Sequence, residues 1–213
     1  MNLKINEIFF SIQGESTFSG KPCIFIRLTY CNLRCSYCDT DYAFHDGRDM
    51  SIKDIIDKIA RYDCKTVEVT GGEPLMQPES IDLMNELLSL GYTVLLETGG
   101  SLPIDKVPKE VYKIIDFKCP SSNMEKKKLW EILDNTESHD EIKFVIGDKL
   151  DFDWAIEKIN KYNLIRKHTV LLSPIHGQLD PQNLAKWILE SGKEMRLQLQ
   201  AHKYIWKPDT RGV

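Results

Sequence analysis

The chain has 213 residues, of which 42% are hydrophobic and 28% charged, so we expect one globular domain spanning residues 1–213. The formal net charge is −4, which gives no basic field and argues against nucleic acid as a partner. No apolar run approaches the length of a membrane span, and the N-terminus lacks the layout of a signal peptide. We therefore expect no membrane contact and a place in the reducing cytoplasm.

In chain order, β-branched and aromatic runs predict strands, and apolar residues at helical spacing predict helices. The expected strands cover residues 3–10, 22–30, 66–70, 92–96, 111–117, 141–146, 168–172 and 195–199. One helix is expected after the capping residue Ser51 and another after Asp180. Three more are expected over residues 79–90, 125–133 and 152–162. Prolines at 103 and 108 leave little room for a helix over residues 98–110, so this crossover should be abbreviated.

The alternation of strands and helices predicts the fold class. Such chains form parallel βαβ units with right-handed crossovers. About six or seven core strands are too few for the eight that close a full (β/α)8 barrel. The predicted architecture is therefore α/β, an open, partial TIM-like barrel of about six parallel strands.

Residues 30–40 contain Cys31, Cys35 and Cys38 in a C-x3-C-x2-C spacing, directly after the apolar run expected to form a strand. Three thiolates in one short loop indicate a metal or cluster that the loop encloses. Iron–sulfur clusters are usually held by four cysteines, and here the fourth is missing locally. A [4Fe–4S] cluster on this loop would leave one iron open for a substrate or cofactor.

Two other interpretations of these cysteines remain open. A zinc ion could take the three thiolates together with His45, although the spacing matches no common zinc finger. Disulfides are less favoured, because the chain has six cysteines in 213 residues and no secretory signal. The other cysteines, Cys23, Cys64 and Cys119, are expected to be buried apolar side chains.

Polar and glycine-rich segments follow most of the expected strands. In parallel α/β folds the carboxyl ends of the strands carry the ligand site. Any one of these segments alone would be an ordinary loop, but together they predict a site on one rim. Besides the cysteine loop, the segments are residues 70–72, 97–100, 118–123 and 173–177.

The C-x3-C-x2-C motif with an aromatic residue before its last cysteine resembles the radical S-adenosylmethionine (SAM) superfamily. A second match is Gly71-Gly72-Glu73-Pro74, which resembles the segment that meets the SAM amino group in that superfamily. The resemblance implies that the amino and carboxylate groups of SAM occupy the open iron of a [4Fe–4S] cluster.

Further stretches resemble one family within this superfamily, the 7-carboxy-7-deazaguanine synthases. They are residues 7–15, 38–40, 69–74, 173–174 and 197–203, together with Arg27. The resemblance covers nearly the whole chain. It implies conversion of 6-carboxy-5,6,7,8-tetrahydropterin to 7-carboxy-7-deazaguanine with loss of ammonia, on the route to queuosine and related deazapurines. It also implies catalytic use of SAM, a requirement for Mg2+, a homodimer and a flavodoxin-like or similar electron donor.

The family's functional residues carry over onto matching positions of this chain. The cluster ligands are Cys31, Cys35 and Cys38, and Thr40 offers its hydroxyl to Mg2+. The expected SAM-binding residues are Tyr37, Cys38, Asp39, Gly72, Lys118, Pro120, Ser121, Ser122 and Ser173. The expected pterin-binding residues are Ile12, Gln13, Gly14, Glu15, Arg27 and Thr70.

Two alternatives to this enzyme come from the same motif. A glycyl-radical activase also carries C-x3-C-x2-C on a small barrel, but it needs a wide docking face for a partner protein and no pterin pocket. A non-catalytic iron–sulfur or zinc module would leave the Gly71–Glu73 segment and the other strand-end segments without a purpose. Elemental analysis separates iron from zinc.

Overall fold

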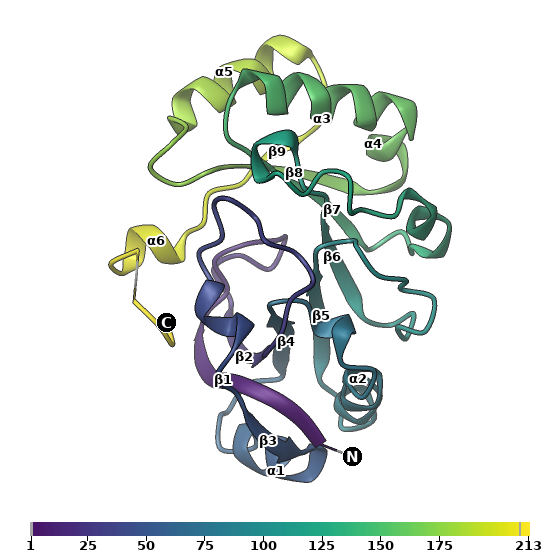
Figure 1. The fold of residues 1–213 in the computed structure, drawn as a ribbon, viewed down its shortest axis with the longest axis vertical. Helices are drawn as coiled ribbons and strands as arrows, with labels where there is room; N and C mark the ends of the chain where they lie inside the picture. Colours follow the sequence, from purple (N-terminus) through teal and green to yellow (C-terminus); the bar gives the residue numbers. More distant parts are fainter. Residues whose placement is uncertain (1, 209) are drawn as a thin grey trace.

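A computed structural model describes residues 2–208 and 210–213 of the chain. One nine-stranded sheet organises the fold, in the order β3-β1-β2-β4-β5-β6-β7-β8-β9 (Figure 1). The first pairings, β1 with β2 and β1 with β3, are antiparallel, and all pairings from β2 to β9 are parallel. The strands are β1 (Asn2–Ile12), β2 (Pro22–Leu28), β3 (Arg48–Ser51), β4 (Thr66–Gly71), β5 (Thr93–Thr98), β6 (Tyr112–Asp116), β7 (Glu141–Ile146), β8 (Thr169–Pro174) and β9 (Arg196–Leu197).

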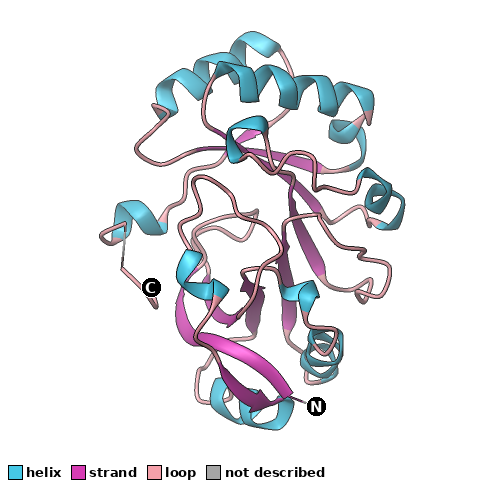
Figure 2. Cartoon of the chain, in the orientation of Figure 1, coloured by secondary structure: helices cyan, strands magenta, loops and turns pink. Residues whose placement is uncertain are grey.

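The parallel part of the sheet curves but does not close, which confirms the open barrel. Helices pack on its outer side: α3 and α5 lie near the β7–β9 end, and α1 and α2 lie near the opposite end (Figures 1 and 2). The α-helices are α1 (Ile52–Ile59), α2 (Ser80–Ser89), α3 (Lys149–Lys161), α4 (Leu164–Lys167), α5 (Pro181–Ser191) and α6 (His202–Ile205). The short 3-10 helices are η1 (Asp41–Phe44), η2 (Pro74–Met76), η3 (Pro120–Ser122) and η4 (Trp130–Asn135). Of the helices described, none is long and apolar enough to span a membrane.

Two helix starts follow the capping signals of the sequence. The Asp54 backbone N–H donates to the Ser51 hydroxyl at 3.1 Å, and the Gln182 N–H donates to the Asp180 carboxylate at 2.9 Å. Such side chains satisfy backbone N–H groups that have no partner inside the helix. Pro181 then occupies the first turn of α5, where its missing N–H costs nothing.

The prediction of a helix over residues 125–133 was wrong. Turns follow η3, and only η4 is helical, with 3-10 geometry. The Leu129 backbone N–H donates to the Gly100 carbonyl at 2.9 Å, and the Trp130 ring stacks on Phe117 with 4.4 Å between ring centroids. These tertiary contacts hold the segment in another path. The last strand is also shorter than predicted, and β3 was not predicted.

Side chains of the central strands alternate between two environments. One set packs under the outer helices, as Val67 and Val69 of β4 and Ile142 and Phe144 of β7 do. The intervening residues point into the barrel, as Glu68 and Lys143 do, and many of these are polar. The period of two along each strand therefore builds an apolar outer layer and a polar interior.

Candidate functional site

A cavity of about 740 Å3 occupies the barrel interior at the carboxyl ends of the strands. The cysteine loop, the first loop of the chain, the strand ends and the last residues of the chain all contribute to its lining. Of the sequence-predicted site residues, the structure brings these to the cavity: Ile12, Gln13, Gly14, Glu15, Arg27, Cys31, Cys35, Tyr37, Cys38, Asp39, Thr40, Thr70, Gly72 and Lys118. Pro120, Ser121, Ser122 and Ser173 do not line it.

The cysteine loop is folded back on itself and attached to η3. The Cys38 N–H donates to the Cys35 carbonyl at 3.2 Å. The Ser36 hydroxyl donates to the Ser121 carbonyl at 2.5 Å, and the Ser36 N–H donates to the Ser122 carbonyl at 3.1 Å. Although Ser121 and Ser122 lie outside the cavity lining, they therefore help to fix the loop that carries the cysteines.

The donor set fits an iron–sulfur cluster. Cys31, Cys35 and Cys38 are free, half-buried thiols on one cavity wall. Burial raises the pKa of Cys35 to about 11, and the nearby Lys118 ammonium lowers it. Thiolates are the ligand form, so positively charged irons would supply the stabilisation that burial removes.

A single zinc ion fits these residues less well. Across residues 2–208 and 210–213, no three His, Cys, Asp or Glu side chains are placed to hold one metal ion. His45 is exposed and lies outside the cavity lining. Tetrahedral zinc needs its ligands around one point, whereas a cubane cluster takes each cysteine on a different iron.

The Gly71–Pro74 segment follows β4 and packs tightly against the start of the cysteine loop. A Cβ atom on Gly72 would lie 2.2 Å from the Tyr30 carbonyl oxygen, so only glycine allows this approach. The buried Glu73 carboxylate accepts hydrogen bonds from the Thr98 hydroxyl at 3.0 Å and the Gly99 N–H at 2.8 Å. Glu73 thereby ties the ends of β4 and β5 together beside the cysteines.

Several buried polar atoms on the cysteine loop and at the strand ends lack a partner within the described part of the chain. They are the Tyr37 hydroxyl, one Asp116 carboxylate oxygen and the Ser173 hydroxyl. Buried polar groups normally find a hydrogen bond, so such atoms mark places for a polar ligand. Asp116 uses its other oxygen to hold Lys118 at 2.7 Å. Burial lowers the pKa of Lys118, but Asp116 outweighs this effect and keeps the ammonium charged.

On the opposite side of the cavity, Arg27 and Gln13 are held by carboxylates. Arg27 Nε donates to Glu7 at 2.8 Å, and the Tyr42 hydroxyl donates to the same Glu7 oxygen at 2.9 Å. Gln13 Nε2 donates to Glu68 at 2.5 Å. The Arg27 guanidinium therefore keeps most of its N–H donors for an anionic ligand.

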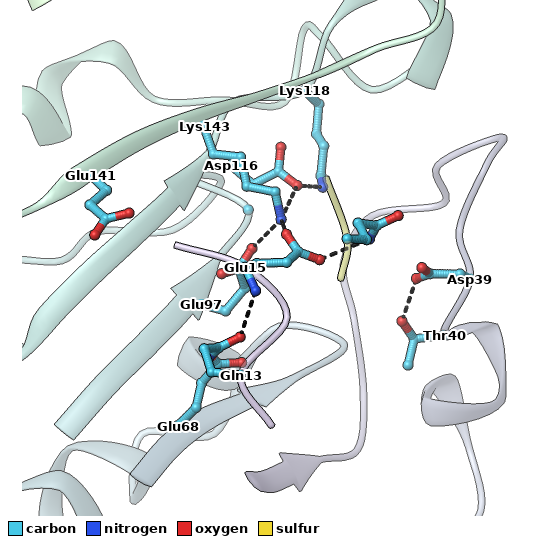
Figure 3. A network of polar contacts seen from close by, with 12 residues as sticks. Gln13, Glu15, Asp39, Thr40, Glu68, Glu97, Asp116, Lys118, Glu141 and Lys143 are labelled. Carbon is cyan, nitrogen blue, oxygen red and sulfur yellow. Dashed lines mark hydrogen bonds and ion pairs between the residues drawn. The ribbon is translucent and has the colours of Figure 1, made fainter. Parts of the chain in front are cut away.

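Lys143 of β7 occupies the centre of the interior, and the sequence analysis did not identify it (Figure 3). Its ammonium contacts the carboxyl groups of Glu15, of Glu97 at 2.8 Å and of Asp116 at 3.9 Å. Gln200 donates to the other oxygen of Glu15 at 2.8 Å. The detectable signal is the alternation within β7, which places Lys143 on the same side of the strand as Glu141, among residues otherwise typical of a buried strand.

Residues of α6 and of the described part of the tail contribute to the cavity lining. Lys203 of α6 pairs with Asp39 at 2.6 Å, and the Thr40 hydroxyl donates to the other Asp39 oxygen at 2.9 Å. A Cβ on Gly14 would lie 2.3 Å from the His202 ring, so Gly14 allows α6 to approach the first loop. The Arg211 guanidinium lies over the Tyr42 ring, 3.8 Å from its centroid. Sequence reasoning placed none of these tail contacts.

Comparisons with known proteins give a consistent result. The family model of the radical SAM superfamily matches residues 25–188. A 7-carboxy-7-deazaguanine synthase of Koribacter versatilis is 45% identical, over 99% of this chain and 100% of the relative. The enzyme of the same name from Chlorobaculum tepidum is 44% identical, over 99% of this chain and 97% of the relative.

Solved structures agree on the fold. The crystal structure of QueE from Escherichia coli matches with a TM-score of 0.80 at 24% identity, over 95% of each chain. Streptococcus suis SuiB bound to S-adenosylmethionine matches with a TM-score of 0.54 at 14% identity, over 80% of this chain and 48% of the other. At these identities the likeness concerns the fold alone.

Proposed function

The chain belongs to the 7-carboxy-7-deazaguanine synthases, a family of radical SAM enzymes, and we propose that it converts 6-carboxy-5,6,7,8-tetrahydropterin to 7-carboxy-7-deazaguanine with loss of ammonia. One observation carries this proposal: a single cavity joins the three-cysteine loop to a polar interior that contains Arg27 and Gln13. A reaction that starts at a cluster and ends in a polar heterocycle needs both in one enclosed space.

Cys31, Cys35 and Cys38 would hold a [4Fe–4S] cluster, and SAM would lie between it and the strand ends. The Tyr37–Asp39 backbone, Gly72 and Lys118 are the cavity residues proposed to contact SAM. Pro120, Ser121, Ser122 and Ser173 are proposed contacts on the same side, and the unpartnered Ser173 hydroxyl supports this. When bound, the cluster and SAM supply the one-electron chemistry that removes a hydrogen atom from the substrate and returns it.

The chain's own task is to bind and orient the pterin. Arg27 offers N–H donors that pair with a carboxylate through a fork. Gln13, Glu15 and Thr70 line the same wall, and Ile12 and Gly14 complete it. A misplacement of about 1 Å in such a site can lower the rate roughly a hundredfold, so rigid holding of these side chains matters.

We place Mg2+ beside Thr40. Mg2+ prefers oxygen ligands, keeps several waters and needs few protein ligands. The Thr40 hydroxyl and the Asp39 carboxylate lie next to each other on the cavity wall, which fits this preference. Thr40→Ala should weaken Mg2+ activation while leaving iron content intact, and Thr40→Ser should retain much of the activation. Equal Mg2+ dependence in wild type and Thr40→Ala would place the metal elsewhere.

From the family we also propose a cytoplasmic homodimer that receives electrons from a flavodoxin-like or similar donor. Light scattering of the purified protein tests the dimer, and reduction of the reconstituted protein by such a donor tests the electron source. The glycyl-radical activase and the non-catalytic module are displaced by the family assignment.

An anaerobic assay with reconstituted protein, SAM, reductant, Mg2+ and the carboxypterin tests the reaction. Reconstituted protein should hold about four irons per chain and lose them on Cys35→Ala. With substrate deuterated at C6, label should appear in recovered SAM, because the hydrogen returns. Product formed with one 5′-deoxyadenosine released per turnover, and no label in SAM, would contradict catalytic use of SAM. Stoichiometric zinc with full activity would contradict the cluster.

A further inference from the structure

Glu97 occupies a distinctive position in the cavity. It lies at the carboxyl end of β5, and its Oε1 accepts a hydrogen bond from Lys143 at 2.8 Å. Its other oxygen makes no hydrogen bond to any described residue, and the side chain keeps 22% of its surface exposed while lining the cavity. One oxygen is thus fixed by the protein, and the other is available to a ligand.

Lys143 is well suited to hold Glu97 in place. Its side chain is only 5% exposed, and its ammonium is surrounded by carboxylates from three directions: Glu15 after β1, Glu97 on β5 and Asp116 on β6 (Figure 3). The ammonium therefore cannot swing away without leaving buried charges unpaired, which is costly. The position of the Glu97 carboxyl is set by this arrangement.

Around Lys143, the barrel interior contains more acidic than basic side chains. Glu15, Glu68, Glu97 and Asp116 face one another around Lys143, and the Asp116 side chain also pairs with Lys118. Burial and the neighbouring carboxylates raise the pKa of Glu97 to about 8, against the opposing effect of Lys143. Glu68, whose pKa burial raises to about 7, has an oxygen engaged by Gln13. Glu97 therefore combines a retained proton at neutral pH with an oxygen open to the cavity.

We propose that Glu97 is the acid that donates a proton to the nitrogen that leaves as ammonia, and that Lys143 is the positioning residue that holds its carboxyl toward the substrate. This inference rests on the proposed function. In the step, the carbon–nitrogen bond breaks with its electron pair on nitrogen, the nitrogen takes the Glu97 proton, and ammonia departs. As the new double bond forms, a ring carbon loses its proton to the Glu97 carboxylate, which restores the acid form of Glu97. No oxidant or reductant is needed.

The first test separates this step from hydrogen abstraction. Glu97→Gln keeps the size and one acceptor but cannot deliver the proton. In single turnovers quenched into acid, this variant should still transfer deuterium from C6 of the substrate into recovered SAM, while releasing ammonia about a hundredfold more slowly, the low end of general-acid effects. Mass spectrometry should show a ring-contracted compound that retains the nitrogen. Normal ammonia release by Glu97→Gln would overturn the proposal.

The pH dependence gives a second test with opposite signs in two variants. Wild-type turnover should fall as the pH rises through about 8, since the acid form of Glu97 is required. Lys143→Met removes a cation that lowers the Glu97 pKa, so the alkaline limb should move to higher pH. Glu15→Gln removes a carboxylate that raises the Glu97 pKa, so the alkaline limb should move to lower pH. If the alkaline limb stays at the same pH in both variants, it reports the titration of a group other than Glu97.

A third measurement does not depend on turnover. In protein without cluster or SAM, labelled with 13C at glutamate carboxyls, one resonance should titrate near pH 8 and be absent from Glu97→Gln. Should Glu97→Gln fail to fold, Glu97→Asp takes its place, and the glutamate resonance that titrates near pH 8 in wild type should be absent from it as well. Absence of any carboxyl titrating above pH 7 in wild type would overturn the proposal. A wild-type enzyme that forms no product at all would instead refute the proposed function.

Discussion

Gly72 shows how one backbone position can determine the path of the cysteine loop. The residue lies where β4 ends, and a Cβ there would lie 2.2 Å from the Tyr30 carbonyl oxygen and 2.7 Å from the Cys31 Cβ. Both contacts involve atoms at the start of the cysteine loop, and neither can give way through a side-chain rotation. We therefore predict that Gly72→Ala displaces the loop and lowers the iron content after reconstitution to less than about half, since the three ligands must share one geometry.

The control for Gly72 is Gly192→Ala. Gly192 ends α5 with φ +63°, and nothing lies within 4 Å of a Cβ built there. Its substitution should cost about 1 kcal/mol of stability through backbone strain and leave iron content unchanged. Iron bound equally by Gly72→Ala and wild type would show that the loop can shift without losing its ligand geometry.

Among the described residues, Lys113 and Asp140 form the most deeply buried ion pair, and neither lines the cavity. Their atoms lie 3.1 Å apart, and the side chains are 1% and 0% exposed. Asp140 also accepts from the Lys113 backbone N–H at 2.9 Å. We predict that Asp140→Asn destabilises the protein by roughly 3–5 kcal/mol, because it leaves a buried ammonium without its counter-charge. Urea unfolding measures this. Asp57→Asn, which breaks the exposed pair with Lys53, should leave the free energy of unfolding nearly unchanged.

At the scale of elements, Asp151 of α3 joins two loops that no sheet hydrogen bond connects. Its carboxylate accepts from the Ser121 N–H at 2.9 Å and from the Gly147 N–H at 2.8 Å, and it is fully buried. Through η3 it also supports the cysteine loop, because Ser36 bonds to Ser121 and Ser122. A helix side chain thus helps to fix the position of the cysteine loop through η3.

We predict that Asp151→Ala destabilises the protein by about 2–4 kcal/mol, since two buried N–H groups lose their acceptor. SAM binding to the reconstituted protein should weaken about tenfold, as measured by equilibrium dialysis. Asp148→Ala is the matched control: Asp148 caps α3 by accepting from the Asp151 N–H at 2.9 Å, and its side chain forms no hydrogen bond to the described residues of η3. It should cost about 1 kcal/mol and leave SAM binding unchanged. Equal SAM affinity in both variants would limit Asp151 to a role in stability.

Elements with a local signal were predictable from the sequence. The caps at Ser51 and Asp180 act between residues two or three apart, and the alternation in β7 needs only six residues to be visible. Residues 125–133 were mispredicted because a distant carbonyl, that of Gly100, holds Leu129. Strand β3 escaped notice because it depends on pairing with the start of the chain, Asn2 opposite Ser51.

The candidate site also has a part that local sequence predicts and a part that depends on distant residues. The cysteine loop and the Gly71–Pro74 segment are contiguous, so their spacing is visible in the sequence. The Lys143 network draws single residues from the loop after β1 and from β5, β6 and β7, so it can be recognised only once the strand order is known. Contacts of the tail, such as that of Lys203 with Asp39, join residues 164 positions apart, and no local sequence pattern predicts them.

For the whole molecule, the polar interior that forms the site also links stability to pH. The apolar layer under the helices drives folding, whereas the barrel interior buries carboxyl groups that would otherwise be hydrated. Burial raises the pKa of Glu68 to about 7 and that of Glu97 to about 8, from an ordinary value of 4.5. Both groups therefore bind protons more tightly in the folded state than in the unfolded chain.

The sign of the pH effect follows from this difference. Between about pH 4.5 and pH 8 the folded state holds protons on Glu68 and Glu97 that the unfolded chain has released, so their contribution to stability falls as the pH rises and levels off above pH 8. We predict that Glu68→Gln with Glu97→Gln, which cannot ionise, raises the unfolding free energy relative to wild type more at pH 9 than at pH 5.5. Urea unfolding of protein without cluster at both values measures the difference. Glu194→Gln, at an exposed carboxyl, should change both values equally. A double variant that parallels wild type at both pH values would show that the two buried carboxyls ionise alike in the folded and unfolded chain.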